Sequence, residues 1–112
     1  MVKIFAKLIK NHKTIKSYTY SNIKEYESVD FYSHLSEISR KLDIPTPIVI
    51  DYHRECYENF NSVKFSKADF VDKQPFDFML IENIDLWIIF KKLRNIISGG
   101  NLWRLQVLLH LS

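Results

Sequence analysis

The sequence predicts an α+β domain with the element order β-β-α-α-β-β and a mostly antiparallel sheet. Strand-like segments occur in consecutive pairs at both ends of residues 1–83, and two helical patterns separated by a Pro-Thr-Pro break lie between them. Consecutive strands tend to pair as antiparallel neighbours, so we expect both helices on one face of the sheet. A C-terminal amphipathic helix is expected to follow this domain, within residues 84–112.

The first helix is predicted to begin after Asp30, whose carboxylate would cap free backbone N–H groups. Arg40 and Lys41 lie in its last turn, where cations suit the negative end of the helix dipole. Pro45 excludes further helix and disfavours helical backbone at Ile44. The apolar stripe recurs at helical spacing and consists of Phe31, Leu35, Ile38 and Leu42.

The second helix is predicted to begin at Pro47, with Thr46 as its cap and Asn61 as a left-handed terminator. Its apolar stripe would consist of Val49, Tyr52 or His53, Cys56 and Phe60. Its water-facing side would carry Asp51, Glu55 and Glu58. So short a link between two helices favours their packing side by side.

Four strands complete the predicted domain. Residues 2–10 and 14–20 alternate or are rich in β-branched and aromatic residues, and they would form a hairpin around the turn at residues 11–13. A short strand over residues 61–65 would lead into a single helical turn, because Ser66 and Asp69 have capping-box spacing. The nearly continuous apolar run of residues 76–81 indicates a central strand.

Length and composition limit the class of protein. The 112 residues suffice for one domain, and 46% hydrophobic residues suffice for a core. The single cysteine excludes an internal disulfide and fits a reducing compartment. Lysines interrupt the apolar pattern of residues 1–9, so no signal peptide is expected. No apolar run is long enough to cross a membrane. We therefore expect a cytoplasmic protein, and the wealth of Ile, Lys and Asn suggests an AT-rich bacterial or phage gene.

The positive charge is concentrated in the C-terminal segment. Residues 1–85 carry 12 Lys and Arg against 13 Asp and Glu, whereas residues 86–112 carry 4 Lys and Arg and no acid. A nearly neutral domain argues against general nucleic-acid binding by residues 1–85.

The pattern of apolar residues in the C-terminal segment predicts an interaction surface. Leu86, Ile89, Phe90, Leu93, Ile96 and Ile97 share a narrow arc of a helical wheel, and Gly99-Gly100 would end this helix. The residues proposed for the surface are Trp87, Phe90, Leu93, Ile97, Trp103, Leu105 and Leu108. Its occupant would be the protein's own core, a second copy of the chain, the groove of another protein, or an anionic membrane surface.

Residues 98–112 differ in composition from the rest. They contain no Ile and no Lys, whereas residues 1–97 contain 14 and 12. Either they are a selected hydrophobic segment that docks on a partner, or they are a non-native sequence read from a shifted frame. The composition favours the second interpretation.

No catalytic or metal-binding constellation is predicted. His53 and Cys56 are three residues apart on the second helix, but a zinc site needs two further ligands, and neither His12 nor His34 has a recognisable spacing to them. As a nucleophile pair, Cys56 and His53 lack a third, orienting group. Because the first glycine is Gly99, no glycine-rich phosphate loop precedes it. We expect no enzyme activity, no metal and no cofactor.

The hairpin offers a candidate nucleic-acid surface. Lys3, Phe5 and Lys7 on its first strand, with Lys16, Tyr18 and Tyr20 on its second, would make one basic and aromatic face. Aromatic rings stack on single-stranded bases and lysines contact phosphates. The alternatives are a merely solvated face, or a face covered by the C-terminal helix.

Residues 1–85 resemble short bacterial proteins of unknown function. The resemblance rests on the segments VKIFAKLIKNHKTIK, KLDIPTP, Phe60-Asn61, and KADFV with the following FDFMLIEN. It implies a fold and no chemistry. The leading hypothesis is a non-catalytic domain that binds another protein or itself, and the alternative is a single-stranded nucleic-acid-binding module.

Overall fold

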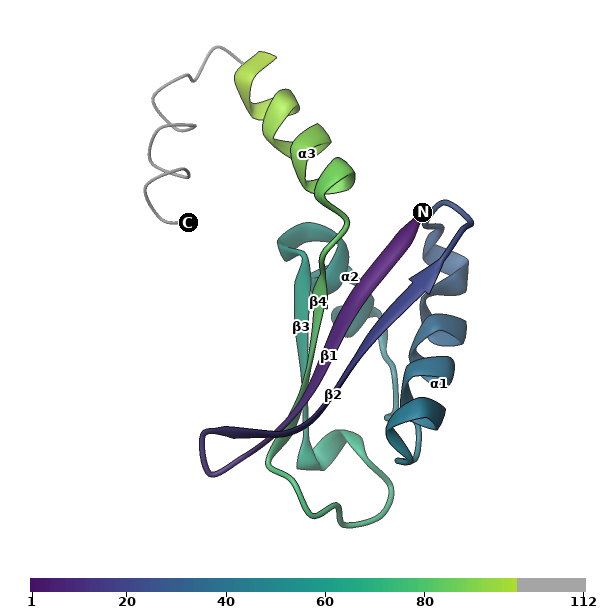
Figure 1. Cartoon of the computed structure of the whole chain (residues 1–112), viewed down its shortest axis with the longest axis vertical. Helices are drawn as coiled ribbons and strands as arrows, with labels where there is room; N and C mark the ends of the chain where they lie inside the picture. The colour runs from purple at the N-terminus through teal and green to yellow at the C-terminus, as the bar shows by residue number, and fades with distance from the viewer. Residues whose placement is uncertain (99–112) are drawn as a thin grey trace.

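Four antiparallel strands form one sheet in the order β2-β1-β4-β3 (Figure 1). The computed structural model describes residues 1–98. The strands are β1 (Val2–Lys10), β2 (Lys13–Asn22), β3 (Ser62–Ser66) and β4 (Phe78–Asn83); the α-helices are α1 (Phe31–Leu42), α2 (Asp51–Phe60) and α3 (Leu86–Ser98); the 3₁₀ turns are η1 (Ser28–Asp30) and η2 (Lys67–Asp69). The predicted α+β class and element order are confirmed, with β4 in the interior of the sheet.

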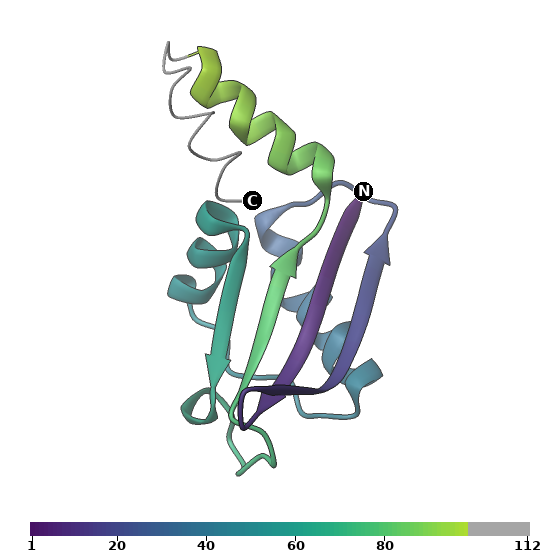
Figure 2. The same ribbon diagram turned by 60° about the vertical axis from the view of Figure 1, so that its left-hand side comes forward.

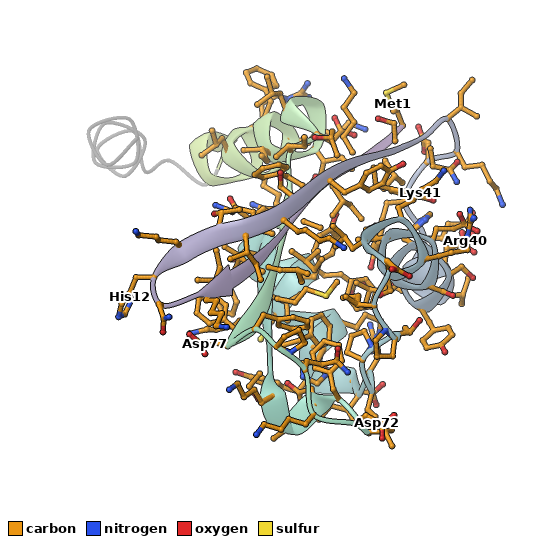
Figure 3. All side chains as sticks on the ribbon, turned by 60° about the horizontal axis from the view of Figure 1, so that its bottom comes forward. Met1, His12, Arg40, Lys41, Asp72 and Asp77 are labelled. Atoms are coloured by element: carbon orange, nitrogen blue, oxygen red, sulfur yellow. The ribbon has the colours of Figure 1, made fainter. Side chains whose placement is uncertain are left out.

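The hairpin between β1 and β2 closes with two residues in the left-handed region, Asn11 at φ 52° and His12 at φ 65°. This is the two-residue turn whose twist suits antiparallel strands. The backbone N–H of Asn11 donates to the Asp77 carboxylate at 2.8 Å, which ties the turn to the loop before β4. Figure 3 shows His12 at the tip of the hairpin, with Asp77 at the same end of the molecule.

The core lies between one face of the sheet and the helices α1 and α2. The two helices cover the same face, so the prediction for them is confirmed (Figure 2). Buried side chains come from alternate positions of β1, β3 and β4, from Tyr20 of β2 and from the helical stripes. They include Val2, Ile4, Ala6, Leu8, Val63, Phe65, Met79, Ile81, Phe31, Leu35, Ile38, Leu42 and Tyr57. Truncating a fully buried member such as Leu35 to alanine would cost about 2–5 kcal/mol.

Helix α1 has the predicted bounds, but its ends are built differently. Asp30 itself has helical backbone, and its side chain makes no capping hydrogen bond. The helix ends because Asp43 turns into the left-handed region at φ 59°, and the N–H of Asp43 donates to the carbonyl of Arg40 at 3.2 Å. The chain has therefore left the helix before Pro45.

Helix α2 begins at Asp51, four residues later than predicted. Residues 45–50 are not helical, and the N–H of Ile48 donates to the carbonyl of Asp69 at 2.7 Å. The N-cap residue is Ile50, and its backbone N–H donates to Nδ1 of His53, the third residue of the helix, at 3.1 Å. The predictions of Thr46 as the cap and of Pro47 as the first helical residue are wrong; Pro47 is instead buried.

The stripe predicted for α2 is also partly wrong. His53 and Tyr57 are its buried residues, whereas Tyr52 and Phe60 are exposed. Glu58, expected to face water, accepts hydrogen bonds from Tyr26 and Arg54. Two other predictions are confirmed: Asn61 ends the helix at φ 61°, and the N–H of Ser66 donates to the Asp69 carboxylate at 2.8 Å.

Candidate binding surfaces

The sheet face opposite α1 and α2 carries no helix among the described residues, and we call it the open face (Figure 2). Its side chains alternate with those of the core. Strand register groups them in rows: Thr19, Phe5, Glu82 and Ser62 in one; Ser17, Lys7, Leu80 and Lys64 in the next; Thr14, Ile9, Phe78 and Ser66 in the third. Four of the six side chains that the central strands β1 and β4 place in these rows are apolar, and the other two, Lys7 and Glu82, form an ion pair. The outer strands contribute mainly small hydroxyl residues.

Two lysines flank the centre of the open face. Leu80 on β4 lies opposite Lys7 on β1 and opposite Lys64 on β3. The Lys7 ammonium group lies 3.2 Å from the Glu82 carboxylate, and the Lys64 ammonium group lies 4.3 Å from the centre of the Phe78 ring. Among the described residues, no carboxylate lies within ion-pair distance of Lys64, so this part of the face has a net positive charge.

The single hairpin face predicted for nucleic acid is wrong. Lys16, Tyr18 and Tyr20 pair with Leu8, Ala6 and Ile4, which belong to the core side, so they point away from Lys3, Phe5 and Lys7. A bulge between Leu8 and Ile9 accounts for the error. It leaves Ile15 without a partner in the register, so the β2 residues after it face the opposite side of the sheet from the side that regular pairing would give. The Lys16 ammonium group instead donates to the Leu42 carbonyl at 2.8 Å, at the C-terminus of α1.

The residues that sequence reasoning missed on the open face are Lys64, Phe78 and Leu80. The alternation of buried Met79 and Ile81 places Phe78 and Leu80 on the opposite side of β4. The apolar run of this strand indicated a central position in the sheet, which is confirmed, yet the side chains of Phe78 and Leu80 are only half-buried.

Helix α3 projects beyond the end of the sheet (Figures 1 and 2). One side of it meets the end of α2, where the Lys92 ammonium group donates to the Glu58 carbonyl at 2.7 Å and also to the Asn61 side chain. Burial lowers the pKa of Lys92 from its ordinary value. Leu86 and Phe90 lie one helical turn apart, and 77% and 52% of their surfaces are exposed.

The predicted interaction surface on the C-terminal segment can be followed in part. Phe90 is exposed and Leu93 is half-buried, and the backbone of Trp87 and Ile97 belongs to α3. Trp103, Leu105 and Leu108, the Gly99-Gly100 break and the interpretation of residues 98–112 as a non-native segment lie outside the described residues, Ser98 excepted.

His34 is buried beside the end of β2. Its Nδ1 lies 2.9 Å from the Tyr20 hydroxyl, which accepts a hydrogen bond from the Asn22 amide at 3.1 Å. Burial lowers the pKa of His34, so the ring is neutral near pH 7. A polar hollow of about 290 Å³ adjoins these side chains and is lined by Tyr20, Asn22, Lys24, Asp30, Ser33, His34 and Glu37.

The other histidine of interest, His53, has a structural role. Its Nε2 lies 3.5 Å from the Asp69 carboxylate, which also accepts from the Ser66 hydroxyl at 3.3 Å. In a catalytic triad the imidazole lies between the serine and the carboxylate, whereas here the carboxylate lies in the middle. The group therefore joins η2 to α2 and does not activate Ser66.

The remaining metal-ligand candidates are not brought together. Cys56 is half-buried against the core, and His12 lies at the hairpin tip. Within residues 1–98, no three His, Cys, Asp or Glu side chains form a group that could hold a metal ion. None of the described helices is long and apolar enough to cross a membrane.

Comparisons with protein-family models, curated proteins and solved structures found no match to this chain. The resemblance to short bacterial proteins therefore stays a prediction.

Proposed function

We propose that this chain is a non-catalytic protein-interaction domain that associates with a second copy of itself through α3. The observation that carries the proposal is the exposure of Leu86 and Phe90, at 77% and 52%, on one side of a helix that projects from the domain. Burying a large apolar side chain fully contributes about 1.5–3 kcal/mol. A ridge of such side chains is a typical core for a helix–helix contact.

Within residues 1–98, the core of the domain leaves more than half of the surface of Leu86 and of Phe90 exposed. The helices α1 and α2 already cover the core side of the sheet, and Lys92 holds the opposite side of α3 against α2. A second copy supplies the same ridge with two-fold symmetry, the commonest arrangement of homodimers. In an antiparallel pair centred between Ile89 and Phe90, Leu86 would pack against Leu93 of the other copy.

The test is sedimentation velocity of the full chain over a range of concentrations. We expect a monomer–dimer equilibrium that is lost in the double variant Leu86→Ser, Phe90→Ser. The matched control is Ile23→Ser, Val71→Ser, which removes two apolar side chains that are 87% and 83% exposed elsewhere; it should associate as the wild type does. A wild-type monomer at every concentration, or an unchanged dimer in the α3 variant, would contradict the proposal.

The nucleic-acid alternative keeps only part of its predicted surface. Lys3, Phe5 and Lys7 remain together on the open face, joined there by Lys64 and Phe78 from β3 and β4. Lysines beside aromatic rings are the feature that supports this alternative. Salt-sensitive binding of single-stranded oligo-dT that is lost in Lys7→Ala would support it.

A further inference from the structure

The open face combines three features of a protein-binding surface. Its two central strands contribute four apolar side chains, Phe5, Ile9, Phe78 and Leu80, which are half-buried with no described helix above them. The ion pair of Lys7 and Glu82 lies among them. Lysines stand beside this centre, and its edges carry Ser17, Thr19, Ser62 and Ser66. An apolar centre with a polar rim is the usual anatomy of an interface. Short side chains at the edges leave the centre accessible.

The positions of the lysines define the chemistry of the partner. Lys7 and Lys64 lie on the two strands that flank Leu80, so their Cα atoms are roughly 10 Å apart. Lys3 adds a third cation on the same face of β1, and Glu82 is the one acid in the rows described. A partner that fits this arrangement presents an apolar side chain between carboxylates.

Two other occupants fit less well. The helix α3 of a second copy carries Lys91, Lys92 and Arg94 and no acid, so its charge has the same sign as the lysines of the open face. For single-stranded nucleic acid, Leu80 and Ile9 offer no stacking surface, and the Lys64 ammonium group already lies over the Phe78 ring.

We propose that the open face binds an acidic amphipathic protein segment, with an apolar side chain of the partner on Leu80 and its carboxylates at Lys7 and Lys64. The interaction is separate from association through α3. The variant Leu86→Ser, Phe90→Ser should therefore retain it, and failure of either proposal leaves the other testable.

The experiment is a fluorescence-anisotropy titration of the full chain into three labelled probes. The first is a synthetic helix-forming peptide with leucine and phenylalanine one turn apart and glutamates beside them. The second carries lysine in place of each glutamate, and the third is single-stranded oligo-dT. We expect binding of the acidic peptide that weakens with rising salt, and no binding of the lysine peptide.

Variants locate the contact. Lys7→Ala and Lys64→Ala should each weaken binding of the acidic peptide about fivefold to tenfold, and Leu80→Ser should weaken it further. Glu82→Gln should strengthen binding, because it removes a carboxylate that competes for Lys7 at 3.2 Å. Lys41→Ala is the matched control, since Lys41 is exposed on α1 on the helix side of the molecule (Figure 3). Unfolding curves would verify that each variant is folded.

Three outcomes would overturn the proposal. They are no binding of the acidic peptide, equal binding of both peptides, and binding that is indifferent to Lys7 and Lys64. If oligo-dT binds with the same dependence on these lysines and the acidic peptide does not, the open face belongs to nucleic acid instead.

Discussion

The Lys92 ammonium group of α3 donates a hydrogen bond to the backbone carbonyl of Glu58 at 2.7 Å, in the last turn of α2. Carbonyls in the last turn of a helix have no intrahelical partner, and a lysine there both satisfies one and suits the helix dipole. This contact fixes the side of α3 that faces the domain, and thus the side that carries Leu86 and Phe90.

Replacing Lys92 should loosen α3 without unfolding the sheet. In Lys92→Met the side-chain stem remains and the charged donor is lost, at a cost of about 1 kcal/mol. Amide hydrogen exchange within α3 should then be about fivefold faster, because opening becomes more favourable by that amount. Lys73→Met changes an exposed loop lysine and should leave the exchange of α3 unchanged. Equal exchange in wild type and Lys92→Met would show that the contact does not hold the helix.

The hairpin turn offers a stabilising substitution. His12 has φ 65°, where a side chain is strained and glycine is not. His12→Gly also creates Asn-Gly, the preferred pair for this turn, and should raise the free energy of unfolding by about 1 kcal/mol in urea titrations. Lys10→Gly, one position before the turn within β1, should lower it instead. A His12→Gly protein less stable than wild type would contradict the turn geometry.

Stability should fall on mild acidification because of His34. Burial lowers the pKa of His34 below its ordinary 6.5. As the pH falls through about 6.5, the unfolded chain takes up the proton first, so unfolding becomes more favourable with a slope of at most about 1.4 kcal/mol per pH unit. Urea titrations at about pH 7.5 and pH 5.5 measure this loss, and His34→Gln should reduce it. The same slope in His34→Gln would assign it to other groups.

Glu58 should stabilise the connection between β2 and α1. Although burial alone would raise its pKa, hydrogen bonds from Ser28, Tyr26 and Arg54 lower the pKa of Glu58 from its ordinary 4.5. Glu58→Gln should cost about 1–2 kcal/mol near neutral pH. The difference from wild type should begin to shrink as the pH falls below about 4.5 and should vanish only below the lowered pKa, where wild-type Glu58 is protonated in the folded state as well. Glu55→Gln, exposed on the same helix, should be neutral. A pH-independent difference would count against the carboxylate's charge as the cause.

Sequence patterns predicted the elements well where one local rule decided the outcome. The stripe from Phe31 to Leu42 has a single helical interpretation, and Asn61 needed only its tolerance of positive φ. The prediction of where α2 begins failed because tertiary contacts hold the Pro-Thr-Pro segment in a non-helical conformation. Pro47 is buried, and the N–H of Ile48 donates to the carbonyl of the distant Asp69. No sequence pattern near Ile48 identifies Asp69 as its hydrogen-bond partner.

The prediction of which β2 side chains share a face with Lys3, Phe5 and Lys7 failed for a related reason. The alternation within KTIKSYTYSN allows either of two alternate sets of side chains to face the core. Only the bulge beside Ile9 and the contact between Tyr20 and His34 select the observed set. The open face could be predicted from β1 alone, through Lys3, Phe5 and Lys7. Lys64 and Phe78 required the strand order, because β3 and β4 are far from β1 in the sequence.

The most direct test of association through α3 is energy transfer between protomers. With Cys56→Ser as background, dyes would be attached at Lys91→Cys on α3 or at His12→Cys at the hairpin tip, which lies at the other end of the sheet from α3 (Figures 1 and 3). Donor-labelled and acceptor-labelled chains would then be mixed. Pairing through α3 predicts efficient transfer between labels at position 91 and little between labels at position 12. Absence of transfer at position 91, or equal transfer at both positions, would contradict it.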